Sequence, residues 1–277
     1  MRGPVAGVTV VIPVWDGYVR YFGEAVESVR RSAPDVPIVV VDNASTTEVP
    51  KLEGCELVRS ERRLTVGAAR NLGLEQVLSA YVVFLDADDM LLDGALQHLH
   101  GRIEAEPALS IAAMSILDGS TGERHRTPRP FVSRLVRWPR AFALANSIWS
   151  LLPIQSCSIM RTEETRAAGG YPDAQLGDDW VLGVSLAWRG RVAVSQRIGR
   201  YYRSTEGSIA SSSWTPAELR GNARLVRDRL RTDPGVPTWA RALLPAIAIL
   251  QLGAIHLLRP LFRIARGLVV RSRSNVR

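Results

Sequence analysis

Short apolar segments alternate with amphipathic segments along the first part of the chain. The apolar segments are continuous and rich in β-branched or aromatic residues, which is typical of strands buried on both faces. The candidate strands are residues 8–12, 38–41, 55–59 and 81–85, and the candidate helices are residues 17–31, 65–78 and 91–104. This alternation predicts an α/β fold with a mostly parallel sheet flanked by helices.

The second half of the chain is less regular. A strand is expected near residues 154–160, followed by helices near residues 162–168 and 178–188. Residues 118–150 mix arginine with proline, so we expect a loop or short helices there. That segment is either a solvated basic surface or a lid that faces an acceptor or a membrane.

Three candidate strands end at polar or turn-forming residues, which are Pro13, Asp42 and Asp86. In an open parallel sheet the ligand lies beyond the carboxyl ends of the strands. We therefore expect these three segments to meet at one crevice.

The sequence FLDADDML places three carboxylates, Asp86, Asp88 and Asp89, directly after the strand at residues 81–85. Neighbouring carboxylates repel one another unless a cation compensates them, and Mg²⁺ and Mn²⁺ prefer oxygen ligands of this kind. The alternative is structural, with Asp88 or Asp89 capping the helix that follows.

A second acidic pair, Asp178 and Asp179, stands at the start of a predicted helix. Asp178 could cap that helix. Asp179 would then be free for acid–base chemistry, and the positive end of the helix dipole favours its ionised form, which suits a general base.

The positive charge is concentrated at the C-terminus. The chain carries a net charge of +8, of which +7 comes from seven arginines in residues 234–277, where no Asp or Glu occurs. A basic tail favours an anionic partner, either a membrane surface or nucleic acid. The aromatic side chains that stack on nucleic-acid bases are not interleaved here, so we do not expect nucleic acid.

Residues 242–258 contain no charged side chain but include Pro245, Gln251 and His256. On a helical projection, polar positions 241, 251, 256, 259, 263 and 266 gather on one arc, and apolar positions such as 243, 247 and 250 occupy the rest. The pattern predicts a helix that lies on anionic lipid rather than one that spans a bilayer. The alternative is a helix packed on the catalytic domain or on a second subunit.

Six stretches in order resemble glycosyltransferase family 2, whose members are inverting nucleotide-sugar transferases with the GT-A fold. They are VTVVIPVWDG (8–17), VVVDNAS (39–45), VGAARNLGL (66–74), FLDADDML (84–91), AAGGYPD (167–173) and GDDW (177–180). The resemblance covers roughly residues 7 to 205. It implies a GT-A domain over residues 1–210 and leaves residues 211–277 as a basic helical extension that associates with a membrane.

The resemblance also implies roles for individual residues. Those expected to bind the nucleotide sugar are Pro13, Val14, Asp42, Asn43, Arg70, Asn71, Asp86 and Ala87. Asp42 would bind the base, Asp86 the ribose or the metal, and Asp88 the metal, which would be Mn²⁺ or Mg²⁺. Asp179 aligns with the catalytic base, although Asp178 replaces the glutamate that usually precedes it.

Two departures from the family pattern bear on mechanism. Thr205 stands where many members have a histidine that helps to hold the metal or diphosphate. Arg203 could bind the diphosphate instead, since guanidinium groups bind phosphate bidentately, or it could be a surface arginine. The Gln-x-x-Arg-Trp motif of processive synthases is absent after Asp179, which favours transfer of a single sugar.

The expected activity is therefore transfer of one sugar from a nucleotide-diphosphate sugar to a hydroxyl acceptor, possible acceptors being a glycan, a lipid-linked molecule or a small molecule. We expect the enzyme at the cytoplasmic face of the membrane. A nucleotidyltransferase or sugar-phosphate enzyme is one alternative, but it needs a glycine-rich loop after the first strand, and residues 13–17 hold a single glycine. A non-catalytic membrane scaffold is the other, and the intact aspartates argue against it.

Overall fold

The computed structural model describes residues 5–118, 130–152, 157–203 and 215–256. Its strands form one eight-stranded sheet in the order β3-β2-β1-β4-β7-β6-β8-β5. The strands are β1 Val8–Val14, β2 Ile38–Asn43, β3 Cys55–Ser60, β4 Tyr81–Phe84, β5 Met90–Leu91, β6 Leu109–Asp118, β7 Ser158–Arg161 and β8 Arg191–Tyr202. The helices are η1 Asp16–Tyr18, α1 Val19–Ser32, α2 Val66–Glu75, α3 Ala95–Glu104, α4 Pro130–Leu135, α5 Pro139–Ile148, α6 Thr162–Ala167, α7 Asp178–Arg189, α8 Pro216–Thr232 and α9 Thr238–Ala242.

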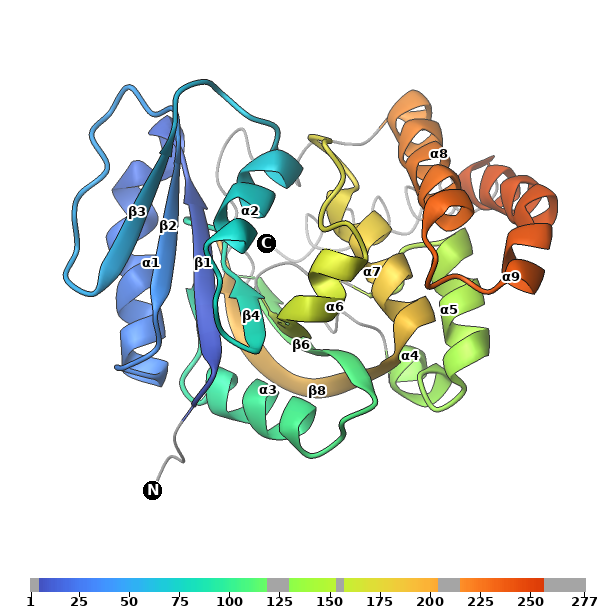
Figure 1. Cartoon of the computed structure of the whole chain (residues 1–277), viewed down its shortest axis with the longest axis horizontal. Helices are drawn as coiled ribbons and strands as arrows, with labels where there is room; N and C mark the ends of the chain where they lie inside the picture. The colour runs from blue at the N-terminus through green and yellow to red at the C-terminus, as the bar shows by residue number, and fades with distance from the viewer. Residues whose placement is uncertain (1–4, 119–129, 153–156, 204–214, 257–277) are drawn as a thin grey trace, which may run out of the picture.

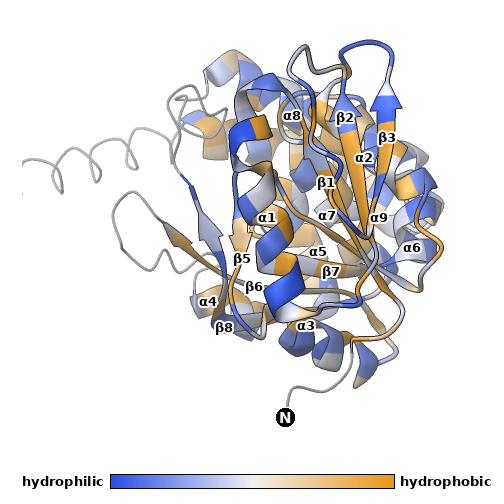
Figure 2. Ribbon diagram, turned by 90° about the vertical axis from the view of Figure 1, so that its left-hand side faces the viewer, coloured by the Kyte–Doolittle hydropathy of each residue, from blue (hydrophilic) through white to orange (hydrophobic). Residues whose placement is uncertain are grey.

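The first half of the sheet is parallel. Strand β1 pairs in parallel with β2 on one side and β4 on the other, and β2 pairs in parallel with β3. Figure 2 shows apolar colour along these strands, whereas α1 alternates apolar and polar residues along its surface. The expected α/β fold with a mostly parallel sheet is confirmed, and β1, β2 and β4 are buried along nearly their whole length.

Helix α2 lies close against this parallel half. A side chain at Gly73 would overlap Val11 and Val41 on the sheet, so only glycine permits the approach. The Thr65 hydroxyl accepts a hydrogen bond from the Ala68 amide at 3.2 Å and caps the helix. The tight packing fixes where the side chains of α2 meet the ends of β1 and β4.

The second half of the sheet is mixed and was only partly predicted. Strand β7 is antiparallel to both β4 and β6, while β6 and β8 run parallel with several register shifts. Neither β6 nor β8 was expected. The sequence of β6, LSIAAMSILD, has small and polar residues among its apolar ones, so its strand character depends on pairing with β7 and β8.

The start of α3 corrects one sequence-based alternative. The helix begins at Ala95 and not near residue 91, because Met90 and Leu91 pair with β8 as strand β5. Its N-cap is Gly94, at φ 76°. Asp88 and Asp89 therefore do not cap this helix, and another role must account for their carboxylates.

The expected short helices between residues 118 and 150 are confirmed as α4 and α5. Residues 119–129, which include three of the arginines noted in this segment, lie outside the described residues. The first part of the strand expected at 154–160 also lies outside them, and the strand itself is β7 at Ser158–Arg161.

The C-terminal helices pack on α7. Figure 1 shows α5, α8 and α9 gathered at one side of the molecule. Trp180, Val181 and Val184 of α7 form an apolar cluster with Val226 of α8 and with Ile247. The extension is thus joined to the rest of the fold by a shared core over residues 215–256.

Residues 244–256 are helical, but the predicted polar and apolar faces of this helix are partly wrong. Gln251 is buried, and its amide donates a hydrogen bond to the Ser147 carbonyl at 2.8 Å. Leu250 is instead 52% exposed. Packing on α5 and α8 decided the orientation, because Ser147 and Arg227 satisfy the buried amide. The alternative of a helix packed on the catalytic domain describes this segment.

Across the described ranges, no helix combines the length and apolar character that crossing a bilayer requires.

Candidate active site

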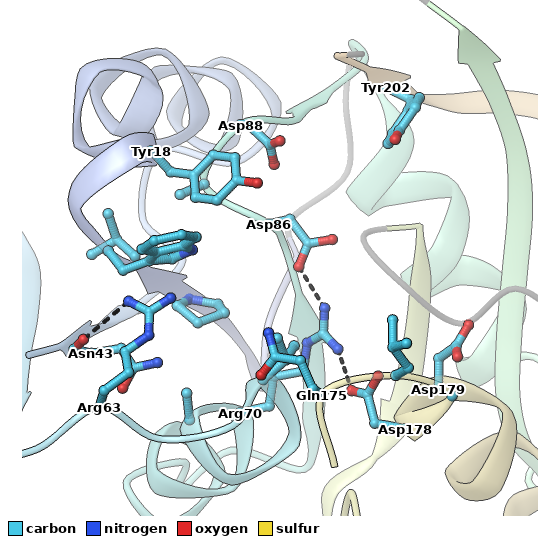
Figure 3. A pocket seen from close by; sticks show the side chains of 18 of the residues that line it. Tyr18, Asn43, Arg63, Arg70, Asp86, Asp88, Gln175, Asp178, Asp179 and Tyr202 are labelled. Atoms are coloured by element: carbon cyan, nitrogen blue, oxygen red, sulfur yellow. Dashed lines mark hydrogen bonds and ion pairs between the residues drawn. The ribbon is translucent and has the colours of Figure 1, made fainter. Parts of the chain in front are cut away.

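A pocket opens at the carboxyl ends of β1, β2 and β4, as expected. Pro13, Val14, Asn43, Asp86 and Ala87 line it from these strands and the loops that follow them. Figure 3 shows the acidic and basic side chains of the opposite wall pointing into the same space. The predicted convergence of three separate segments is therefore present in the fold.

Arg70 of α2 connects the two walls. Its buried guanidinium donates to Asp86 Oδ1 at 2.6 Å and forms a second ion pair with Asp178. The guanidinium carbon also lies 5.2 Å from the centre of the Tyr171 ring. Burial by itself lowers the pKa of Arg70, but Asp178 and Asp86 outweigh it and raise that pKa, so the side chain is a fixed cation.

Asp88 lies near Asp86 without a comparable partner. Within the described residues no basic side chain forms an ion pair with its half-buried carboxylate. Burial and the charge of Asp86 raise the pKa of Asp88 to about 6. A carboxylate in this environment gains from a nearby cation.

The carboxylates Asp86 and Asp88 fit a site for Mg²⁺ or Mn²⁺. Such ions often take only one or two protein carboxylates and complete their shell with substrate phosphate and water. The described part of the chain holds no group of three or more His, Cys, Asp or Glu side chains arranged for a metal. The donor set present is therefore one that a phosphate ligand would have to complete.

Asp89, the third aspartate, has a structural role. Its buried carboxylate pairs with Arg200 of β8 at 2.5 Å and accepts a hydrogen bond from the Arg203 amide at 3.2 Å. These contacts tie the loop that carries Asp88 to the end of β8. The crowding of carboxylates after β4 is thus relieved partly by protein arginines.

The second acidic pair begins α7. Gly177, at φ 74°, is the N-cap, so the expectation that Asp178 caps the helix is wrong. Asp178 is buried in its pair with Arg70, whereas Asp179 lies half-buried in the pocket wall. Burial and the charge of Asp178 raise the pKa of Asp179 to about 7.

Three predicted binding residues do not line the pocket. Asp42 is buried in an ion pair with Arg59, and its other oxygen accepts a hydrogen bond from the Ser45 amide at 2.9 Å. The Asn71 amide group bonds the backbone of Tyr171 and holds the following turn. Contact between Asp42 and a nucleotide base would require Arg59 to move.

Arg203, the third of these residues, lies beside the pocket. It pairs with Glu24 at 2.5 Å, and its Nε donates to the Asp88 carbonyl at 3.1 Å. The position therefore supports the loop that carries Asp88 directly. Thr205 lies outside the described residues.

Several pocket residues were missed from the sequence. Trp15 and Tyr18 pack edge to face with ring centres 5.2 Å apart, and the Arg63 guanidinium lies 3.6 Å from the centre of the Trp15 ring. The aromatic residues in PVWDGY, directly after the first strand, were the available signal. Arg200 and Tyr202 also line the pocket and were missed because β8 was not predicted.

Solved structures share this fold. Residues 1–349 of S. aureus TarS in complex with UDP-GlcNAc match with a TM-score of 0.66 and 17% identity, covering 90% of this chain and 72% of that one. The complex of the same TarS residues with UDP matches with a TM-score of 0.64 and 16% identity, covering 89% and 71% of the two chains. At such identity the likeness shows the fold alone, and it confirms the expected GT-A architecture.

Sequence comparisons identify the family. An uncharacterized glycosyltransferase of Rickettsia felis is 30% identical over 92 residues, and one of Rickettsia conorii is 28% identical over 92 residues. Each match covers 30% of this chain and only 15% of the relative's length. The family model described as glycosyl transferase family 2 matches residues 9–164, more than half of the chain. The chain therefore belongs to glycosyl transferase family 2.

Proposed function

We propose that the protein transfers a single sugar from a nucleotide-diphosphate sugar to a hydroxyl acceptor, with inversion at the anomeric carbon. The observation that carries the proposal is the meeting of Asp86, Asp88 and Asp179 in one pocket, with Arg70 joining the walls. Two carboxylates can hold a cation on the phosphate side, and a third faces the same space with no basic partner among the described residues.

The donor side is the wall formed by β1, β2 and the Trp15–Arg63 stack. An aromatic ring under a guanidinium offers a flat surface for a nucleobase. The Asn43 side chain adds rigidity, because it bonds the Leu64 backbone through both its amide and its carbonyl groups, at 3.1 and 2.8 Å. A uridine diphosphate sugar is the donor class that we would test first, since the TarS structures bind UDP-GlcNAc and UDP.

Mn²⁺ or Mg²⁺ would be held by Asp88, with Asp86 beside it. When bound, such an ion neutralises negative charge that grows on a leaving diphosphate. The protein contributes the placement of the two carboxylates. Two arginines fix the positions of these carboxylates. Arg70 pairs with Asp86, and Arg203 donates a hydrogen bond to the Asp88 carbonyl.

Asp179 is the proposed general base. It would accept the proton of the acceptor hydroxyl while that oxygen forms a bond to the anomeric carbon and the nucleoside diphosphate departs. A general base of this kind contributes about 10²- to 10⁴-fold in rate. A pKa of about 7 lets the carboxylate be substantially ionised near neutral pH and still basic enough to take a proton.

The basic tail would hold the enzyme at an anionic membrane surface on the cytoplasmic side. That location suits a lipid-linked acceptor, because such an acceptor reaches the pocket from the membrane. The support is the charge of +7 in residues 234–277, where each basic residue near an anionic surface contributes about 1 kcal/mol.

A panel of nucleotide sugars tests the reaction class. The full chain is incubated with each donor and Mn²⁺, and release of the nucleoside diphosphate is measured with and without candidate hydroxyl acceptors. One preferred donor, with release that stops when the metal is chelated, supports the proposal. Release of pyrophosphate from a nucleoside triphosphate and a sugar phosphate would identify a nucleotidyltransferase instead.

A further inference from the structure

Helices α4 and α5 present an unusual exposed surface. Two aromatic side chains face solvent there, with Phe131 49% exposed and Trp138 71% exposed. Three exposed arginines lie among them, namely Arg134, Arg137 and Arg140. We call these five residues the α4–α5 surface. Large exposed aromatic groups are uncommon on a soluble surface unless they meet a partner.

The helix at residues 244–256 also exposes apolar side chains. Its outward side carries Ile249 at 70% exposure, Leu250 at 52% and Leu252 at 43%. The same helix is bonded to the end of α5 through Gln251 and Ser147. Trp138 precedes the other end of α5, about 14 Å away along a helix of this length. The two exposed groups therefore belong to neighbouring elements of one side of the molecule (Figure 1).

The segment that carries α4 and α5 has charge of one sign along the sequence. Residues 130–152 contain three arginines and no Asp or Glu. Aromatic residues combined with arginines match the chemistry of a bilayer interface, where rings enter the headgroup region and guanidinium groups meet lipid phosphate.

We infer that the α4–α5 surface, together with Ile249, Leu250 and Leu252, docks on an anionic phospholipid bilayer. The inference rests on the proposed membrane attraction of the tail, not on the sugar-transfer reaction. It assigns the contact to folded elements, with Trp138 and Phe131 entering the lipid interface and the three arginines contacting phosphate. The positive charge of the tail would then strengthen the attraction of the chain to the same anionic bilayer.

The docking surface lies next to the base-bearing helix. Trp180, which follows Asp179, donates through its indole nitrogen to the Asn146 carbonyl of α5 at 2.6 Å. The Trp188 indole bonds the Ser147 hydroxyl at 3.1 Å. A bilayer in contact with α4 and α5 would thus lie on elements that directly support Asp179, which suits delivery of an acceptor from the membrane.

Co-sedimentation with vesicles tests the inference on the full chain. Vesicles of phosphatidylcholine alone are compared with vesicles that also contain phosphatidylglycerol, at low and high salt. The double variant Phe131→Ser/Trp138→Ser should bind the anionic vesicles at least about tenfold more weakly. Leu78→Ser is the matched control, because Leu78 is 97% exposed on the loop between α2 and β4, and its binding should not change.

Charge removal gives a second, independent comparison. Replacing Arg134, Arg137 and Arg140 by Gln should weaken binding by about fivefold per arginine at low salt. Replacing Arg20, Arg62 and Arg102, which are exposed on other elements, removes the same charge and should have a much smaller effect because these charges would lie farther from the bilayer. Hydrogen exchange in the wild-type chain should slow within residues 130–152 when anionic vesicles are added.

Three outcomes would overturn the inference. If the aromatic pair can be removed without loss while Arg271, Arg273 and Arg277 cannot, the tail binds lipid and the α4–α5 surface does not. If no anionic vesicle binds the chain, both membrane proposals fail, whereas donor hydrolysis still reports on the transferase. If the chain dimerises in light scattering and the double variant is monomeric without any lipid effect, the surface is a contact between two copies.

Discussion

The two halves of the sheet are built in different ways. The parallel half, β3-β2-β1-β4, contains the continuous apolar strands β1, β2 and β4, and its carboxyl ends form one wall of the pocket. The other half, β7-β6-β8-β5, is mixed, contains irregular pairing, and leads to the helices that support Asp179. The first half is specified by local pattern, while the second depends on contacts between distant segments.

Arg70 links the two halves through its ion pairs with Asp86 and Asp178, so its replacement should have the largest effect on stability. Arg70→Met leaves Asp178 and Asp86 close together without their shared cation, and breaking a buried pair in this way costs about 3–5 kcal/mol. The free energy of unfolding, measured in denaturant, should fall by that amount. Arg102→Met, at an exposed position of α3, should change it by less than about 0.5 kcal/mol. An equally small change in both variants would mean that the halves do not depend on this link.

The difference between the two halves also explains which strands and site residues could be predicted from the sequence. The strands of the parallel half, Asp86, Asp88 and the position of Asp179 followed from apolar runs and from the family motifs. The strands β6 and β8 did not, because their small and polar residues become strand only through pairing with each other and with β7. Arg200 and Tyr202 were missed with them. The face of the C-terminal helix was assigned wrongly because a projection cannot show that Ser147 would satisfy Gln251.

The proposed metal site at the end of the parallel half can be tested separately through Asp88. Asp88→Ala removes the carboxylate that lacks a basic partner among the described residues, so the affinity for nucleoside diphosphate in Mn²⁺ should fall by about 10- to 100-fold. In chelator, the variant and the wild type should bind equally. Calorimetry with both conditions gives the comparison. Asp35→Ala, an exposed aspartate before β2, is the control. Equal affinities with Mn²⁺ for Asp88→Ala and wild type would contradict a metal role.

Asp179, the proposed general base, should control how the turnover rate depends on pH. Asp179 accepts a proton only when it is ionised, and its pKa is raised to about 7 by burial and Asp178. The turnover rate should therefore rise with pH through about 7, with about a tenfold difference between pH 6 and pH 8. Because the folded state disfavours the charged form, this group makes folding less favourable as pH rises from about 4 to 7. A turnover rate that stays constant between pH 6 and pH 8 would argue against Asp179 as the general base.

We propose separate roles for the two adjacent aspartates on α7, with Asp178 holding Arg70 and Asp179 taking the acceptor proton. The most direct measurement is the single-turnover rate of Asp179→Asn and Asp178→Asn, together with the affinity of each for the donor and its melting temperature. Asp179→Asn should lose about 10²- to 10⁴-fold in rate while retaining donor affinity and stability. Asp178→Asn should melt at a lower temperature and keep a rate that rises with pH, with the midpoint moved to lower pH because the charge of Asp178 no longer raises the pKa of Asp179. Near-full turnover in Asp179→Asn, or loss of the pH dependence in Asp178→Asn alone, would contradict the account and make Asp178 the base.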